Sequence, residues 1–289
     1  MTAPRLWYQG ARPKTLGVSV SCVLVGTAAG SLTGPTDWWR AAAALVVAVA
    51  LQVGVNYAND YSDGVRGTDA QRRGPVRLTA TGLASPQAVR NAAICAFGVA
   101  AVVGGVLSLV VNPWLLLIGA AAIVAAATYT GGPKPYGYSG LGELMVLVFF
   151  GFVGTIGSAY VQHESIPVEA WYGALVVGLP ACAIMLTNNI RDIATDTVAG
   201  KRTLAVRLGQ RRARRLYVAC LVASMATVGA CGVLAPWTLL AFLAAPLAIA
   251  PARNVVTRDD PPGLIAALVG TSRFLLVLSI LFAAGLWLS

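Results

Sequence analysis

The sequence predicts an all-α polytopic membrane protein with about nine transmembrane helices. Of its 289 residues, 57% are hydrophobic and only 11% are charged, and the mean hydropathy is +0.72. The core of a water-soluble domain of this size does not require so much apolar sequence. The apolar residues also lie in stretches that match the roughly 17 to 25 residues of a bilayer-spanning helix. We therefore expect a single integral membrane domain over residues 1–289.

Basic, polar or Gly/Pro-rich segments mark the boundaries of these stretches. A short basic segment precedes the first stretch, and runs of Arg precede the third and the seventh. The second stretch ends in NYANDYSD at 56–63, the sixth ends in NNIRDIATD at 188–196, and YTGGPKPYGYSGLGE separates the fourth from the fifth. The expected spans are 16–31, 39–58, 88–110, 113–130, 141–160, 170–190, 213–234, 236–252 and 263–288.

The distribution of Lys and Arg predicts the orientation in the membrane. Positive side chains are retained in short cytoplasmic loops, and all but Arg40 and Arg273 of the 21 Lys and Arg residues fall on one side of the expected spans. The N-terminus is therefore expected in the cytoplasm and Ser289 outside. The net charge of +10 then reflects topology and contact with anionic lipid headgroups, so we expect the lipid bilayer, and no nucleic acid, as the partner of these loops.

The Cys and His residues indicate neither redox nor His-based chemistry. All five Cys residues lie in apolar spans without a C-x-x-C pair, which is typical of small buried hydrophobic side chains. His163 is the single histidine and lies on the expected outer side, far from both polar runs. A His-based triad or metal site at the cytoplasmic face is therefore excluded.

The two polar runs present oxygen ligands at helical spacing. The first has the spacing i, i+4, i+7 and the second i, i+4, i+8, so each set is expected along one helix face. Carboxylates from two helix ends repel one another unless cations lie between them. Oxygen ligands without His or Cys favour a hard ion such as Mg²⁺, which shares its coordination with substrate phosphates. The expected ligands are Asn56, Asp60, Asp63, Asn188, Asp192 and Asp196.

A simpler alternative is that these Asp and Asn residues only cap helix ends. Acidic side chains favour helix N-termini, whereas these lie at C-terminal ends, where the helix dipole disfavours them. Basic residues close by also fit a diphosphate, because Arg and Lys stabilise charge on a transferring phosphate. Any one loop Arg can equally serve topology. The diphosphate-binding candidates are Arg66, Arg72, Lys134 and Lys201, and the candidates for contact with an acceptor or a passing carbocation are Tyr129, Tyr136 and Arg12.

These motifs resemble those of the UbiA-type superfamily of intramembrane aromatic prenyltransferases, along essentially the whole chain. ARPKTL at 11–16, NDYSDGVRGTD at 59–69, GGPKPYGYSGLGE at 131–143 and GKRTLAVRLG at 200–209 are similar to the branch that acts on 1,4-dihydroxy-2-naphthoate in menaquinone synthesis. One departure is Gly67, where the broader pattern has a carboxylate. The next carboxylate, Asp69, falls off the helical face of Asp60 and Asp63.

The resemblance implies a fold, a reaction and a location. The helices would surround a central cavity open to the cytoplasmic side of the bacterial plasma membrane, and both Asp-rich motifs would hold Mg²⁺ against a polyprenyl diphosphate. The allylic carbocation would then be attacked by 1,4-dihydroxy-2-naphthoate with loss of CO₂, giving demethylmenaquinone. Asp60, Asp63, Asp192, Asp196 and Lys134 are the catalytic candidates, and no general base is assigned.

Two rival interpretations stay open. Another acceptor, such as 4-hydroxybenzoate, would fit the same superfamily. A cation-coupled transporter also uses carboxylates near broken helices, although its sites lie at the midplane and these runs lie at one face. Arg273, about ten residues into the last span, either reaches the cavity as a functional charge or lies on a kinked or shifted helix.

Overall fold

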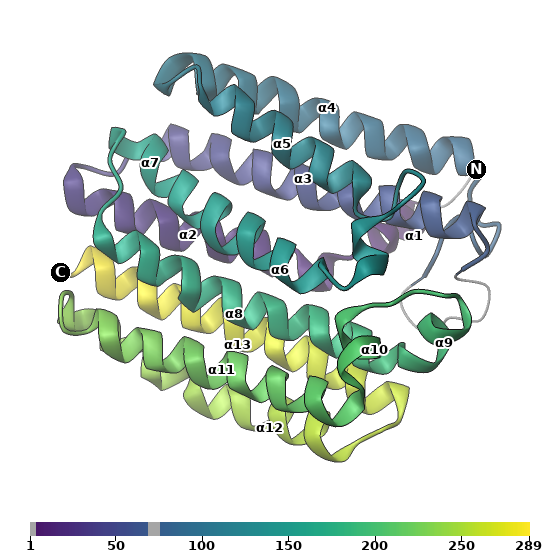
Figure 1. Cartoon of the computed structure of the whole chain (residues 1–289). Helices are drawn as coiled ribbons and strands as arrows, with labels where there is room; N and C mark the ends of the chain where they lie inside the picture. Colours follow the sequence, from purple (N-terminus) through teal and green to yellow (C-terminus); the bar gives the residue numbers. More distant parts are fainter. Residues whose placement is uncertain (1–3, 69–75) are drawn as a thin grey trace.

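Long helices that run side by side make up the fold in the computed structural model of the chain, which describes residues 4–68 and 76–289 (Figure 1). No strand occurs within those ranges. The spanning segments are α2 (Gly17–Gly30), α3 (Trp38–Val65), α4 (Pro86–Val111), α5 (Leu115–Thr128), α6 with η4 and α7 (Gly142–Val146, Leu147–Ile156 and Gly157–His163), α8 (Val168–Arg191), α11 (Gln210–Cys231), η5 with α12 (Pro236–Ala244 and Ala245–Thr257) and α13 (Pro261–Trp287).

Short helices lie before and between these spans at one end of the bundle. They are α1 (Pro4–Gly10), η1 (Pro13–Thr15), η3 (Tyr136–Ser139), α9 (Ile193–Val198) and α10 (Leu204–Leu208), while η2 (Ser31–Thr33) follows α2. The prediction of an all-α polytopic membrane protein is confirmed, and each expected span corresponds to a helical segment. In the described residues, seven spans are long and apolar enough to cross a membrane, α2 forms an eighth together with the helix before it, bent by 51°, and α5 is shorter.

Capping residues fix the starts of three long helices. The side chain of Asp37 accepts a hydrogen bond from the backbone N–H of Arg40 at the start of α3. Ser85 does the same for Ala88 in α4, and Asp260 for Gly263 in α13. Each side-chain oxygen satisfies one of the donors that a helix start leaves unpaired.

Helix α8 lies at the centre of the bundle. Its most apolar stretch is 72% buried, against 22% for α3 and α4, whose outer faces are exposed. Glycines allow its close packing, since a Cβ on Gly178 would lie 2.9 Å from the Cα of Gly151 in η4. Association of helices inside a membrane depends on such close approach of backbones.

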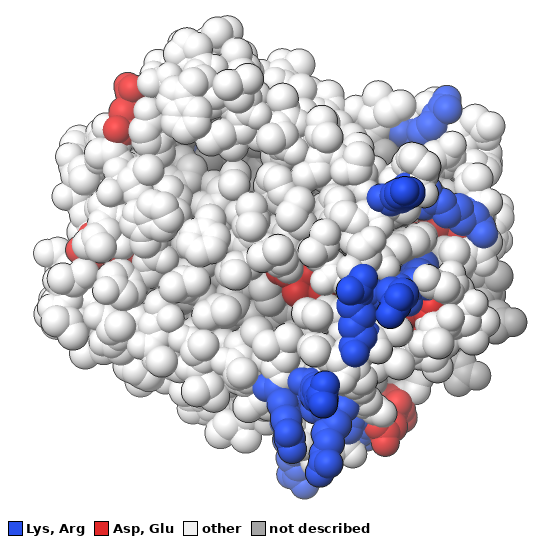
Figure 2. All heavy atoms as spheres, in the orientation of Figure 1, with Lys and Arg blue, Asp and Glu red and all other residues white. Residues whose placement is uncertain are grey.

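The two ends of the bundle differ in charge. On the face drawn in Figure 2, Lys and Arg gather at the end where α9 and α10 lie, and they are almost absent elsewhere. The opposite end holds the start of α3 and the end of α13, where the indoles of Trp38 and Trp287 lie 6.0 Å apart. This asymmetry matches the bias of Lys and Arg along the sequence.

Arg273 does not reach the interior of the bundle. Its side chain is exposed on the outer surface of α13, and it is not among the residues that line the interior cavity described below. Its helical neighbours Ser272 and Phe274 are buried. Of the two interpretations of Arg273, the one that has it reach the cavity does not agree with the structure, because the helix presents that position outward.

Candidate active site

A cavity of about 160 Å³ opens at the basic end of the bundle. Its wall combines segments that are far apart in the sequence: the entry to α2, the second half of α3, the Tyr-rich loop before α6, η4, the end of α8, and the loop after α9. The polar lining residues are Arg12, Thr15, Gln52, Asn56, Asn59, Asp63, Arg77, Tyr129, Thr130, Tyr138, Asn188, Asn189, Asp196, Lys201 and Thr203, and the apolar residues behind them include Val146, Phe150, Ala181 and Ile184.

The α3 wall is a stripe of polar side chains with a heptad-like spacing. Gln52, Asn56, Asn59 and Asp63 line the cavity, and they recur at i, i+4, i+7 and i+11, which keeps them on one helix face. The Nδ2 of Asn56 donates to the carbonyl oxygen of Ala11 at 2.9 Å. Asn59 accepts a hydrogen bond of 2.7 Å from the Thr130 hydroxyl. These bonds hold the amides in place.

Asp60 points away from this stripe. Its two carboxylate oxygens accept hydrogen bonds from the backbone N–H groups of Leu78 and Thr79, at 2.8 and 2.9 Å, and it is not part of the cavity lining. With about 100° per residue in a helix, Asp60 lies to one side of both Asn56 and Asp63. The structure therefore does not place the three predicted α3 ligands together.

Asp63 is the charged centre of the cavity. Its carboxylate lies 3.4 Å from the Lys201 ammonium and 3.8 Å from the Arg77 guanidinium, and the Tyr138 hydroxyl donates to it. Asp63, Arg77 and Lys201 are all buried. Because each partner comes from a different loop, folding brings two cations and a phenol to a single carboxylate. This buried group is net positive, which suits an anionic ligand.

The second polar wall is divided in the same way as the first. Asn188 and Asp196 line the cavity. Helix α8 ends at Arg191, and the carboxylate of Asp192 binds the guanidinium of Arg191 at 2.7 and 2.8 Å. The continuous helical face expected over these residues is interrupted at Asp192, because the chain bends there before α9 begins. Asp192 is buried but lies outside the lining.

The tyrosines of the loop before α6 pack at the cavity mouth. Tyr129 lines the cavity, and its ring meets that of Tyr136 edge-to-face at 5.4 Å. The Tyr136 hydroxyl donates to the carbonyl oxygen of Ala125 instead of facing the cavity. Burial and the neighbouring Asp63 raise the pKa of Tyr138 to about 12, and the Lys201 ammonium lies 4.6 Å from the centre of its ring. Tyr138 therefore connects the loop to the charged centre.

The predicted basic residues differ in their positions. Lys201 and Arg12 line the cavity, and Arg12 has a left-handed backbone with φ of 56°. Arg66 is exposed and donates to the carbonyl oxygens of Thr130 and Gly132. Lys134 is exposed and is not part of the lining. Arg72 and Asp69 lie outside the described residues.

Several cavity residues were not among the predicted ligands or diphosphate contacts: Gln52, Asn59, Arg77, Tyr138 and Asn189. The heptad-like recurrence of polar residues in α3 could have identified Gln52 and Asn59, since an apolar span has no other reason to place amides at that spacing. Tyr138 stood within the quoted loop before the fifth stretch, and Arg77 within the Arg-rich segment before the third, without a signal that separated them from their neighbours.

The profile of the UbiA prenyltransferase family matches residues 19–278 of the chain. The chain belongs to this family. It is 44% identical over 280 residues to the 1,4-dihydroxy-2-naphthoate octaprenyltransferase of Mycobacterium tuberculosis, covering 97% of this chain and 96% of the relative. It is 38% identical to the Escherichia coli protein of the same name, with 98% and 95% covered.

The fold of this UbiA-family protein also has solved counterparts. A UbiA homolog from Archaeoglobus fulgidus, solved with GPP and Mg²⁺ bound, superposes with a TM-score of 0.61 over 96% of this chain and 99% of that one. The two sequences are 14% identical, so this likeness concerns the arrangement of the helices.

The donor groups of the cavity fit a magnesium ion that is shared with a substrate. Among the described residues, no three carboxylate, imidazole or thiol side chains converge to hold a metal by themselves. The wall offers the carboxylates of Asp63 and Asp196 and several amide oxygens. Mg²⁺ prefers oxygen ligands and commonly takes only one or two carboxylates, with phosphates and water completing its coordination. A cation between the two walls thus matches the residues present.

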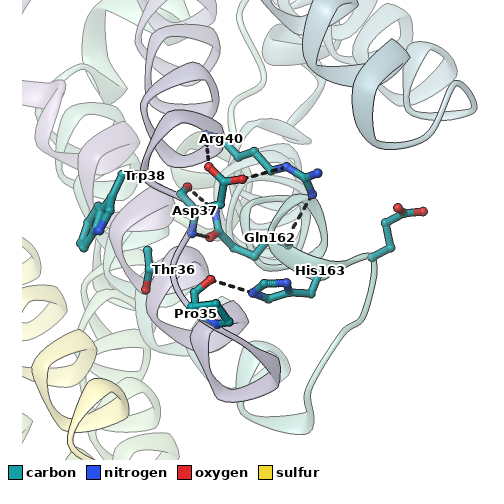
Figure 3. A pocket seen from close by; sticks show the side chains of 8 residues that line it. Pro35, Thr36, Asp37, Trp38, Arg40, Gln162 and His163 are labelled. Carbon is teal, nitrogen blue, oxygen red and sulfur yellow. Dashed lines mark hydrogen bonds and ion pairs between the residues drawn. The ribbon is translucent and has the colours of Figure 1, made fainter.

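A second, larger pocket of about 470 Å³ lies at the opposite end, between the start of α3 and the end of α7 (Figure 3). There Arg40 pairs with Asp37 and donates to the carbonyl oxygens of Val161 and Gln162. Gln162 and Asp37 exchange hydrogen bonds, and the His163 ring contacts the carbonyl oxygen of Pro35. These polar groups bind one another, so they join two chain segments and do not indicate a ligand.

Proposed function

We propose that the protein transfers a polyprenyl group from a polyprenyl diphosphate to 1,4-dihydroxy-2-naphthoate, with decarboxylation, to give demethylmenaquinone. The observation that carries this proposal is the single cavity in which Asp63 and Asp196, from different helices, meet the buried base Lys201 above an apolar interior. The choice of acceptor is supported by relatives of 44% and 38% identity, both named for that reaction. The family membership supports the reaction class.

The polar end of the cavity would bind the diphosphate and its metal. We assign Asn56, Asp63, Asn188 and Asp196 to the part of the wall that faces Mg²⁺. Asp60 and Asp192 lie at the ends of the same two helices, α3 and α8. When bound, Mg²⁺ neutralises charge on the diphosphate oxygens. Lys201 and Arg77, both within 4 Å of Asp63, would stabilise the leaving diphosphate as the allylic C–O bond breaks. Arg66 and Lys134 are exposed and would contribute at most weak outer contacts to the diphosphate, and the predicted contact Arg72 lies outside the described residues.

The apolar part of the cavity would protect the cation and hold the prenyl chain. Val146, Phe150, Ala181 and Ile184 lie behind the polar groups and keep water away from the allylic carbon. The faces of Tyr129 and its neighbour Tyr136 can stabilise positive charge. The prenyl chain of the donor would extend among the membrane spans. A lipid donor and a soluble acceptor would therefore meet at the membrane interface.

The acceptor reaction balances without a protein base. The ring carbon that bears the ionised carboxylate forms the new C–C bond with the allylic cation. Loss of CO₂ returns an electron pair to the ring, so aromaticity is restored and a neutral quinol remains. Arg12, which lines the cavity, would bind the acceptor carboxylate before this step. We place this cavity and the N-terminus in the cytoplasm and Ser289 outside, because positive residues gather at that end.

The proposal is tested by pyrophosphate release from the full-length protein in detergent. With a polyprenyl diphosphate, Mg²⁺ and 1,4-dihydroxy-2-naphthoate, we expect stoichiometric pyrophosphate and a prenylated product that lacks the carboxyl carbon by mass spectrometry. EDTA should abolish both.

Replacing the acceptor separates the alternatives. Faster release with 4-hydroxybenzoate than with the naphthoate would keep the family reaction and overturn the acceptor. Absence of both Mg²⁺ and donor binding would overturn the transferase activity and favour the cation-coupled transporter.

A further inference from the structure

A buried carboxylate lies beside the cavity without a role in the reaction above. Glu143, at the start of α6, is 5% exposed. Its Oε1 accepts a hydrogen bond of 2.7 Å from the Nδ2 of Asn189, and its Oε2 is buried without a hydrogen-bond partner in the described part of the chain. Asn189 lines the cavity. The pair therefore connects a buried acid in α6 to the cavity wall in α8.

The contact determines how the Asn189 amide is oriented. A carboxylate only accepts hydrogen bonds, and an amide donates only through its NH₂ group. The Nδ2 of Asn189 faces Glu143 Oε1 at 2.7 Å, which directs the carbonyl oxygen of the amide to the other side. Within residues 4–68 and 76–289, the Asn189 side chain makes no further hydrogen bond. The cavity wall consequently presents an acceptor at this point, next to apolar side chains.

The contact with Glu143 distinguishes Asn189 from its neighbour Asn188. Both residues line the cavity, but Asn189 is turned by about 100° around α8 and its amide is held by a residue of α6. The negative end of a carbonyl dipole repels phosphate and carboxylate oxygens, and it suits a hydroxyl donor. An aromatic acceptor with ring hydroxyls offers that donor.

We propose that Asn189 accepts a hydrogen bond from a ring hydroxyl of the aromatic acceptor, and that Glu143 is the positioning residue that fixes its amide. This inference rests on the proposed function and names the residues that select a hydroxylated acceptor. Glu143→Gln breaks the arrangement, because a glutamine can also donate and lets the Asn189 amide turn over. Its backbone and volume stay nearly unchanged.

The kinetic test compares four full-length proteins: wild type, Glu143→Gln, the double variant Glu143→Gln with Asn189→Asp, and His163→Gln at the opposite end as a control. In Glu143→Gln, we expect the KM for the acceptor to rise roughly tenfold. This rise corresponds to the loss of one hydrogen bond of about 1.4 kcal/mol. The KM for the donor and the Mg²⁺ requirement should not change. The double variant should restore a KM for the acceptor close to the wild-type value. The introduced glutamine donates to one oxygen of the introduced aspartate, and the other carboxylate oxygen faces the cavity.

A binding test keeps this inference separate from the proposed function. Wild-type protein should bind 1,4-dihydroxy-2-naphthoate more tightly than 1,4-dimethoxy-2-naphthoate, which lacks the hydroxyl donors, and Glu143→Gln should lose that preference. Equal preference in the two proteins, or a fall in thermal stability without a change in acceptor KM, would show that the pair is only structural and would overturn the inference. Absence of pyrophosphate release together with a preserved hydroxyl preference would instead overturn the proposed reaction.

Discussion

The two ends of the bundle both carry Asp, Arg and amide side chains, yet they use them differently. At the Figure 3 end, Asp37, Arg40 and Gln162 satisfy one another and the nearby backbone. At the basic end, Asp63 meets cations from two separate loops inside a cavity. The first arrangement closes a connection between helices. The second holds charge in a buried place. Burial of charge costs free energy, so such a group indicates a function.

The comparison also shows that size does not identify the site. The pocket at the Figure 3 end is larger, about 470 Å³ against about 160 Å³. It is shallow and is lined by only two chain segments, 35–40 and 162–164, whereas residues from several segments of the chain line the smaller cavity. Convergence of distant, buried, opposite charges is the better indicator of chemistry.

The largest expected effect comes from replacing one aspartate at each end of the bundle. Asp63→Asn removes the charge that binds Lys201 and Arg77 and faces the cavity, so we expect kcat/KM to fall by about 100-fold or more. Asp37→Asn keeps a good helix cap and should leave kcat/KM unchanged, with a stability loss of about 0.5 kcal/mol. Pyrophosphate release and thermal unfolding of both variants give the measurement. Equal loss of activity in the two would remove the distinction between the ends.

The membrane spans could be predicted from the sequence because the apolar stretches that indicate them are local features. Each expected stretch corresponds to a helical segment, since the length of an apolar run is what a bilayer selects. Of the predicted metal ligands, Asn56, Asp63, Asn188 and Asp196 line one cavity, and their role as ligands stays a prediction. The break of α8 at Asp192 was not foreseen, because the helical spacing of the polar residues continues through it and gives no sign of the break.

The direction of Asp60 could not be predicted for a different reason. Its partners are the backbone amides of Leu78 and Thr79, which the loop after α3 brings back to the helix. Lys134 and Lys201 were given the same role from sequence, yet one is exposed and the other is buried beside Asp63. Contacts between loops decide such details, and one sequence contains no local sign of them.

Two lysines at the basic end are expected to contribute differently to donor binding. Lys201→Met removes a buried cation from the charged centre, and we expect the KM for the polyprenyl diphosphate to rise roughly tenfold, as for a charge-assisted hydrogen bond of about 1.5 kcal/mol. Lys134→Met removes an exposed cation and should change the same KM by no more than about twofold. Initial rates at varied donor concentration measure both. A larger effect for Lys134 would place the diphosphate at the loop and not inside the cavity.

The smallest effect concerns the phenol that connects the loop to Asp63. Burial and Asp63 raise the pKa of Tyr138 to about 12, so the folded protein keeps this hydroxyl protonated where the unfolded chain ionises. Its contribution to stability is therefore complete below about pH 10, the ordinary tyrosine value, and is lost as the pH rises from about 10 to about 12. Tyr138→Phe should lower Tm by roughly 2 to 4 °C at pH 8, the loss of about one hydrogen bond, and this gap should narrow above pH 10. Tyr8→Phe, at a side chain that is 65% exposed, is the matched control and should show no gap at any pH. If the Tyr138→Phe gap stayed constant between about pH 8 and 11.5, the bond to Asp63 would not depend on the phenolic proton, and the loop would be held by ring packing alone.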